Sequence, residues 1–201
     1  MKKCMLAVST LLLAGSSYAQ TSFGILAGTT FSNPAIKTAG SSQQNKMRMG
    51  AVAGIYANLA VAPALYIHPA LQYEMKGGKS KTTGRKTKLG YLTLPVDLMF
   101  KPHTGGSWFV GAGPYVGYGL SGKLTGGGDD FPAVDKLFKA GDGLKRMDAG
   151  AHLQAGYAFN EGLQIAIATE QGLLNLRKQG TTSNRFRNNA YSVTVGYTFG
   201  K

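Results

Sequence analysis

The chain has 201 residues and a formal net charge of +13, from 22 lysines and arginines against nine aspartates and glutamates. Its single cysteine, Cys4, excludes an internal disulfide and any site built from several thiolates. No stretch approaches the roughly 18 uninterrupted apolar residues of a membrane-spanning helix, and long 3.6-residue apolar periods are missing. These features exclude helical bundles and helical membrane proteins, whereas the 29 glycines, 10 tyrosines and 9 phenylalanines suit β-structure.

The first residues have the layout of a secretory signal peptide. Two lysines precede an apolar run over 4–13, and small residues follow up to Ala19. The run is too short to cross a bilayer as a helix. We therefore expect residues 1–19 to be a cleaved signal peptide and residues 20–201 to form one exported domain.

Beyond residue 20, apolar residues alternate with small or polar ones, which is the pattern of β-strands with two unlike faces. The connections after the first, third, fifth and seventh segments are long and polar, and those between are short. Long loops at one end and tight turns at the other are typical of outer-membrane barrels. We therefore predict an all-β fold, an eight-stranded antiparallel up-and-down transmembrane β-barrel with long extracellular loops and short periplasmic turns. The predicted strands are 22–31, 46–57, 64–76, 88–101, 107–121, 145–159, 162–174 and 190–199.

One face of the predicted strands carries no charge, and its aromatic residues gather near the strand ends. Aromatic rings favour the two interfaces of a bilayer, so two such bands indicate lipid contact. An eight-stranded barrel is also too narrow to enclose so many large apolar side chains. We therefore expect the apolar face to point outward. The predicted aromatic belts are Phe23, Phe100, Trp108, Tyr157, Tyr197 and Phe199 near the turns, and Phe31, Tyr73, Tyr118 and Tyr191 near the loops.

The opposite face holds the charged residues of the strands, together with many glycines and several tyrosines. Buried charges need partners, because an unpaired ion loses its hydration without compensation. We expect an ion-pair and hydrogen-bond network that plugs the lumen, in preference to a proton relay or a ligand site. Because proline has no donor for the ladder, we also expect bulges at Pro69, Pro95 and Pro114. The predicted network is Arg48, His68, Glu74, Asp97, Arg146, Asp148, His152 and Glu170.

Several segments carry a family resemblance: YLTLPVDLMFKP, WFVGAGPYVGYGLSGK, DAGAHLQAGYAF, LQIAIATEQGLLNL and the closing YSVTVGYTFGK. With these segments, the chain from about Thr21 to Lys201 resembles the PorT-type outer-membrane β-barrel family of Gram-negative bacteria. The resemblance implies an eight-stranded barrel and an outer-membrane location. The named member is associated with protein secretion across the envelope, but most relatives have no assigned activity, so the resemblance implies no particular activity.

Motifs for catalysis and metal binding are missing from the sequence. GGKS over 77–80 lacks the earlier glycine of a phosphate loop, and no Gly-x-Ser-x-Gly or His-Glu-x-x-His motif is present. The adjacent aspartates of GGGDD are more typical of a solvated loop than of a calcium site. His68 and His152 fall on the interior face, away from the lipid-facing surface where a lipid-modifying enzyme would need them. We therefore predict no enzyme, no metal site and no cofactor.

The surplus positive charge lies in the long loops. Basic groups beside a membrane attract anionic headgroups, so we expect contacts with outer-membrane lipids, including lipopolysaccharide phosphates. Binding of an envelope protein is a second possibility, and we expect no binding of nucleic acid at this location. The predicted role is envelope structure or surface interaction. The alternatives are a small transport pore, an outer-membrane lipid-modifying enzyme and a soluble ligand-binding barrel. The predicted basic rim is Lys79, Lys81, Arg85, Lys86, Arg177, Lys178, Arg185 and Arg187.

Overall fold

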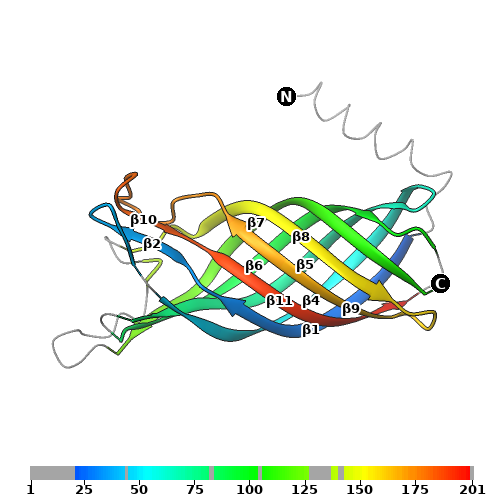
Figure 1. Cartoon of the computed structure of the whole chain (residues 1–201), viewed down its shortest axis with the longest axis horizontal. Coiled ribbons are helices and arrows are strands. Elements are labelled where there is room, and N and C mark those ends of the chain that lie inside the picture. The colour runs from blue at the N-terminus through cyan, green and yellow to red at the C-terminus, as the bar shows by residue number, and fades with distance from the viewer. Residues whose placement is uncertain are drawn as a thin grey trace, which may run out of the picture.

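Eight long strands close into one antiparallel barrel, in the order β1-β11-β9-β8-β7-β6-β5-β4 (Figure 1). The computed structural model describes residues 21–43, 45–81, 84–103, 106–126, 137–139 and 143–199, and the predicted signal peptide lies outside these residues. The predicted fold class is confirmed, and each predicted barrel strand is present. The barrel strands are β1 (Thr21–Ser32), β4 (Asn45–Ala62), β5 (Leu65–Ser80), β6 (Lys86–Phe100), β7 (Ser107–Thr125), β8 (Met147–Ala158), β9 (Leu163–Gly172) and β11 (Asn189–Phe199).

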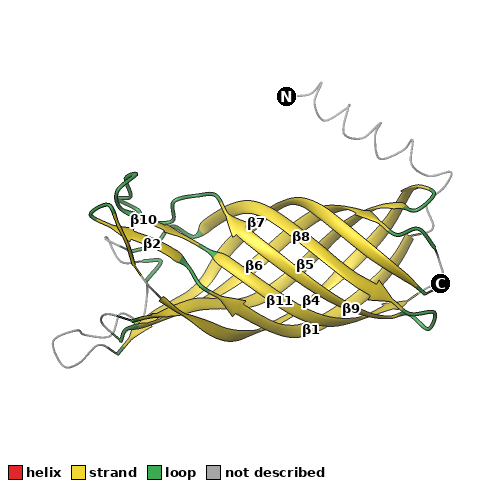
Figure 2. Cartoon of the chain, viewed as in Figure 1, coloured by secondary structure: helices red, strands yellow, loops and turns green. Residues whose placement is uncertain are grey.

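The strands run along most of the molecule, and the connections gather at its two ends (Figure 2). We call the end that carries β2 and β10 the loop end, and the opposite end the turn end (Figure 1). No helix long and apolar enough to cross a membrane occurs among the described residues.

Burial alternates along each strand, because successive side chains point to opposite faces of a sheet. On β6 the outward side chains Leu92, Leu94, Val96, Leu98 and Phe100 are exposed. The inward side chains of the same strand are buried: Leu89, Tyr91, Thr93, Pro95, Asp97 and Met99. The contrast is large, since outward Leu98 is 53% exposed and inward Tyr91 is 0% exposed. The apolar face therefore points outward, and the polar face fills the lumen.

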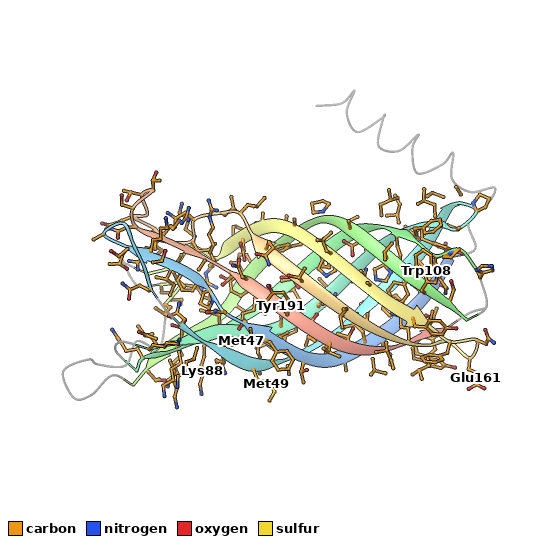
Figure 3. The ribbon with its side chains drawn as sticks, in the orientation of Figure 1. Met47, Met49, Lys88, Trp108, Glu161 and Tyr191 are labelled. Atoms are coloured by element: carbon orange, nitrogen blue, oxygen red, sulfur yellow. The ribbon has the colours of Figure 1, made fainter. Side chains whose placement is uncertain are left out.

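The side chains of the predicted aromatic belts lie on the outward face, in two groups towards the two ends of the strands. At the turn end, Trp108 pairs in register with Tyr157, and the Trp108 ring lies 5.6 Å from that of Phe100. Towards the loop end, Phe31 pairs with Tyr191, and the row Tyr73–Leu92–Tyr118 crosses three strands. Figure 3 shows Trp108 near the turn end, Tyr191 farther along the barrel and Lys88 close to the loop end. The described strands thus continue beyond the second belt.

The expected bulges at the prolines are wrong. The ladder keeps the same register on both sides of Pro69, and Pro114 pairs with Ala151 in step. A proline removes one ladder donor but adds no residue, so neighbouring pairs stay aligned. The register shifts fall instead between Met47 and Val52, between Ala60 and Ala62, and between Gly90 and Tyr91.

A second, three-stranded sheet lies at the loop end, in the order β10-β2-β3. It joins β2 (Ala35–Thr38) and β3 (Ser41–Gln43), from the first long loop, to β10 (Arg185–Arg187), from the last. These strands escape prediction because three or four residues are too few to display a period of two. The sheet carries Phe186, which is buried against the barrel mouth.

Candidate functional site

The lumen is filled by side chains that change in character from one end to the other. At the loop end an apolar cap joins residues of β6, β10 and two loops: Leu89, Tyr91, Phe138, Leu144, Leu176 and Phe186. Towards the turn end a second apolar cluster contains Met99, Phe109, Ala158 and Ala166. Charged and amide side chains occupy the space between these clusters, as described next.

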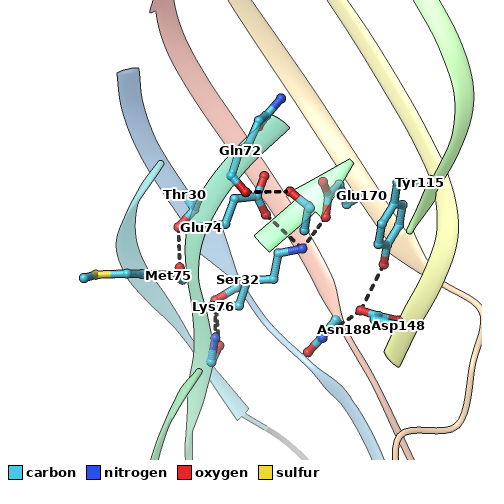
Figure 4. A network of polar contacts seen from close by, with 12 residues as sticks. Thr30, Ser32, Gln72, Glu74, Met75, Lys76, Tyr115, Asp148, Glu170 and Asn188 are labelled. Carbon is cyan, nitrogen blue, oxygen red and sulfur yellow. Dashed lines mark hydrogen bonds and ion pairs between the residues drawn. The ribbon is translucent and has the colours of Figure 1, made fainter. Parts of the chain in front are cut away.

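Lys76 of β5 is the centre of the polar lumen (Figure 4). Its ammonium Nζ lies 2.8 Å from Oε2 of Glu74 and also contacts Oε2 of Glu170, and its side chain is 1% exposed. The same ammonium lies 5.6 Å and 5.2 Å from the ring centroids of Tyr91 and Tyr115, within cation–π range. Lys76 thus links strands on opposite sides of the barrel through two carboxylates and two aromatic rings.

Asp148 of β8 forms a second polar cluster beside Lys76. Its Oδ2 accepts hydrogen bonds from Oη of Tyr115 at 3.2 Å and from Nδ2 of Asn188 at 2.8 Å (Figure 4). Asp148 is 0% exposed, and Asn188 immediately precedes β11. The cluster therefore joins β7, β8 and the start of the closing strand.

The two predicted interior histidines lie nearer the turn end and are also satisfied. Nδ1 of His152 lies 2.7 Å from Oδ2 of Asp97, and the amide of Gln154 donates to the same oxygen at 2.6 Å. Nδ1 of His68 lies 2.7 Å from Oδ1 of Asn58. Both histidines are buried in the lumen, where no lipid can reach them.

Among the described residues, neither Arg48 nor Arg146 has the carboxylate partner expected of it. Arg48 donates to the main-chain carbonyl of Lys76 at 3.0 Å, beside the register shift of β4. Where that shift interrupts the ladder, the hydroxyl groups of Thr30 and Ser32 on β1 also donate to main-chain carbonyls of β5. Arg146 donates to the carbonyl of Gly119 at 2.7 Å and lies over the Phe138 ring. Lys76 instead pairs with two carboxylates. It is the last residue of the predicted strand 64–76 and is not part of the predicted network.

The apolar cap depends on a glycine of β7. A Cβ added to Gly119 would lie 2.3 Å from Cζ of Phe138, so any side chain there displaces the ring. The Phe138 ring packs edge-on against Tyr91, with 5.7 Å between centroids.

We expect Gly119→Val to leave the barrel folded but to loosen the cap. Trypsin cleavage after Lys139, which is exposed beside Phe138, should become about tenfold faster, equivalent to about 1.4 kcal/mol. Gly117→Ala is the matched control, because its added Cβ meets only ordinary contacts of 3.4 Å or more. Equal cleavage rates in both variants would show that Phe138 does not hold this loop.

The residues of the predicted basic rim lie at the loop end, where some belong to strands, some line a cavity and others lie in loops. Lys79 and Lys86 face each other across β5 and β6, and Lys81 is exposed just beyond β5. Arg85 and Arg177 line a cavity of about 350 Å³ at the barrel mouth. Lys178 is exposed in the loop after β9, and Arg185 and Arg187 belong to β10.

The structure resembles small barrels among the solved structures. Neisserial surface protein A matches with a TM-score of 0.50 and 13% identity, over 88% of this chain and 97% of that one. The Yersinia pestis attachment invasion locus protein Ail, solved with the heparin analogue sucrose octasulfate, has a TM-score of 0.47 and 13% identity, over 89% and 99%. The outer membrane enzyme PagL has a TM-score of 0.49 and 13% identity, over 86% and 98%. At these identities the likeness concerns the fold alone.

No curated protein sequence matches the chain. The family model of the outer membrane protein β-barrel domain matches residues 16–178, which is most of the sequence. An apolar outward face and a closed eight-stranded barrel agree with that match. The chain therefore belongs to the outer membrane protein β-barrel domain family and is a protein of the outer membrane.

Proposed function

We propose that this protein is a closed barrel that acts in envelope structure or surface interaction and does not conduct solutes. The observation that carries the proposal is the ion pair of Lys76 with Glu74 and Glu170, set across the lumen between the rings of Tyr91 and Tyr115. A charged group in this position would obstruct any solute passing along the axis. The lumen of eight strands is only wide enough for such side chains.

Under this proposal the charged residues of the predicted interior network stabilise the barrel and help to fill its lumen. His68, Asp97, Asp148 and His152 are each bonded to a neighbouring side chain, which supports a structural role over a proton relay. The outward aromatic belts anchor the barrel at the two interfaces of the bilayer. The basic rim faces the outside, where anionic lipid headgroups or an envelope partner would meet it.

Conductance in a planar bilayer tests the closed lumen against the rival function, a small transport pore. We expect the wild-type protein to give no current steps. A variant with Lys76→Ala, Tyr91→Ala, Tyr115→Ala and Phe109→Ala should conduct, because it removes the cation and the rings of the central plug together with the buried ring of the turn-end cluster. The matched control removes two outward rings, Tyr73→Ala and Tyr118→Ala, and should stay silent. Steady, selective steps from the wild type would establish a pore and overturn the proposal.

We also propose that the protein is not an enzyme. A lipid-modifying site would need a histidine on the lipid-facing surface, and both strand histidines are buried in the lumen. Acyl-chain turnover by the purified barrel, abolished by His152→Ala, would contradict this.

Within its family, we propose that the chain belongs to the PorT-type branch. The support is the set of sequence segments quoted above, which span β6 to β11. We assign no secretion role to it on that ground.

A further inference from the structure

Five lysines form two rows across the outward side of β4 to β7 at the loop end. In the sheet register Lys46 lies opposite Lys79, and Lys79 lies opposite Lys86. In the neighbouring row Lys88 lies opposite Lys123. All five are exposed, and we call them the lysine ladder.

This arrangement concentrates charge of one sign. Directly opposed residues of antiparallel strands have Cβ atoms about 5 Å apart, and like charges in such pairs are destabilising. The described carboxylates lie elsewhere: Glu74, Asp97, Asp148 and Glu170 are buried in the lumen, and Glu161 lies at the turn end (Figure 3). The remaining four, Asp129, Asp130, Asp135 and Asp142, are outside the described residues. A mobile anion that binds beside Lys79, Lys86 and Lys88 would relieve the repulsion between these like charges.

A groove lies directly below the ladder, on the side towards the membrane. Its volume is about 660 Å³, and its lining includes Tyr73, Met75, Lys88, Ser121 and Lys123. Gly90 keeps the groove open, since a Cβ there would lie 2.7 Å from Oη of Tyr73 and 2.6 Å from Oγ of Ser121. Two hydroxyl groups and the ammonium group of Lys88 thus meet around an open space, and all three donate hydrogen bonds to phosphate oxygens.

The groove also lies at the depth of lipid headgroups. The row Tyr73–Leu92–Tyr118 marks the outer aromatic belt, and Lys88 lies four residues beyond Leu92 on the same strand. With strands tilted by about 40°, four residues rise roughly 10 Å along the membrane normal. This reaches the polar layer beyond the hydrocarbon, and lysine side chains can bend back towards it.

We propose that the ladder and its groove form a binding site for the phosphorylated headgroup of an outer-leaflet lipid, with Lys79, Lys86 and Lys88 as the principal contacts. The site deepens the proposed function, on which it rests, by giving the general attraction of the basic rim a specific location. The ammonium groups pair with phosphate oxygens, the Tyr73 and Ser121 hydroxyls donate to them, and Tyr73 and Met75 contact the upper part of the acyl chains.

The test measures binding of diphosphorylated lipid A to the folded barrel in detergent micelles, by native mass spectrometry, with dephosphorylated lipid A for comparison. A ladder variant carries Lys79→Gln, Lys86→Gln and Lys88→Gln, and a control removes the same charge at the same end by Lys37→Gln, Lys139→Gln and Lys145→Gln. We expect the ladder variant to lose about a hundredfold in affinity, because each cation beside an anionic headgroup contributes about fivefold. The control should lose about threefold or less.

Two further measurements distinguish binding at this site from a diffuse attraction of lipid to the basic rim. Gly90→Val fills the groove without changing charge and should weaken binding about tenfold. Without lipid, the ladder variant should unfold at a higher temperature than the wild type, since its repulsion is reduced. Equal losses in ladder and control variants would overturn the site and leave a diffuse attraction of the rim intact. If the wild type bound both lipids equally, the site and the proposed lipid contact of the rim would both be wrong, whereas the closed lumen is tested separately by conductance.

Discussion

Replacing Lys76 by methionine is expected to lower the free energy of unfolding by about 3–5 kcal/mol. The substitution keeps the approximate length and apolar stem of the side chain but removes the ammonium that Glu74 and Glu170 share. Two buried carboxylates would then face each other without a counter-charge, since both are almost completely excluded from solvent. Urea unfolding in lipid vesicles, followed by the loss of the compact form in cold detergent electrophoresis, measures the change.

The partners of Lys76 provide the controls for this result. Adding Glu74→Gln and Glu170→Gln to Lys76→Met removes the unpaired charges and should restore most of the lost stability. Lys79→Met alters an exposed lysine of the same strand and should change stability by less than about 0.5 kcal/mol. A Lys76→Met protein as stable as the wild type would show that the ion pairs are not formed in the lumen.

The second large effect concerns the outward face. Leu153 of β8 is 52% exposed and lies four residues from Tyr157 of the turn-end belt, near the middle of the apolar band. Leu153→Arg should cost about 2–4 kcal/mol in a bilayer, because a charge at this depth loses its hydration. On an exposed face in water the same substitution would be nearly neutral. The measurement is the same unfolding titration in vesicles.

Two further variants separate the effect of membrane depth from the effect of the introduced charge. Met147→Arg lies at the level of Tyr118, close to the interface, and should cost about 1 kcal/mol or less. Leu153→Ala removes volume without adding charge and should change stability little, since lipid chains fill the space. Equal costs for Leu153→Arg and Met147→Arg would contradict the proposed position of the band.

The barrel could be predicted from sequence because alternation in long strands is a strong signal. β11 repeats a large apolar residue at every second position from Tyr191 to Phe199, and the structure exposes all five. Loop lengths then indicated which strand ends lie together. The signal fails where strands are short, so β2, β3 and β10 cannot be predicted from alternation.

The interior partners were harder to predict, because pairing across a lumen depends on register between strands. Lys76 precedes Gly77 and Gly78, and this run of lysine and glycine has the composition of a loop, although β5 continues to Ser80. Its spacing of two from Glu74 places both side chains on one face and could have indicated a shared role. The bonds of Arg48 to the main chain depend on the β4 register shift, for which the sequence carries no clear signal.

The central claim, an outward face in lipid and a filled lumen, is tested most directly by proton NMR of the methyl-labelled barrel in lipid nanodiscs. Outward Val193 and Val195 should show magnetisation transfer from lipid acyl chains and none from water. Inward Val52, which is 2% exposed, and inward Leu89 should show transfer from neither. Water contacts at Val52 or Leu89 would contradict the filled lumen, and water contacts at Val193 or Val195 would contradict the orientation of the faces.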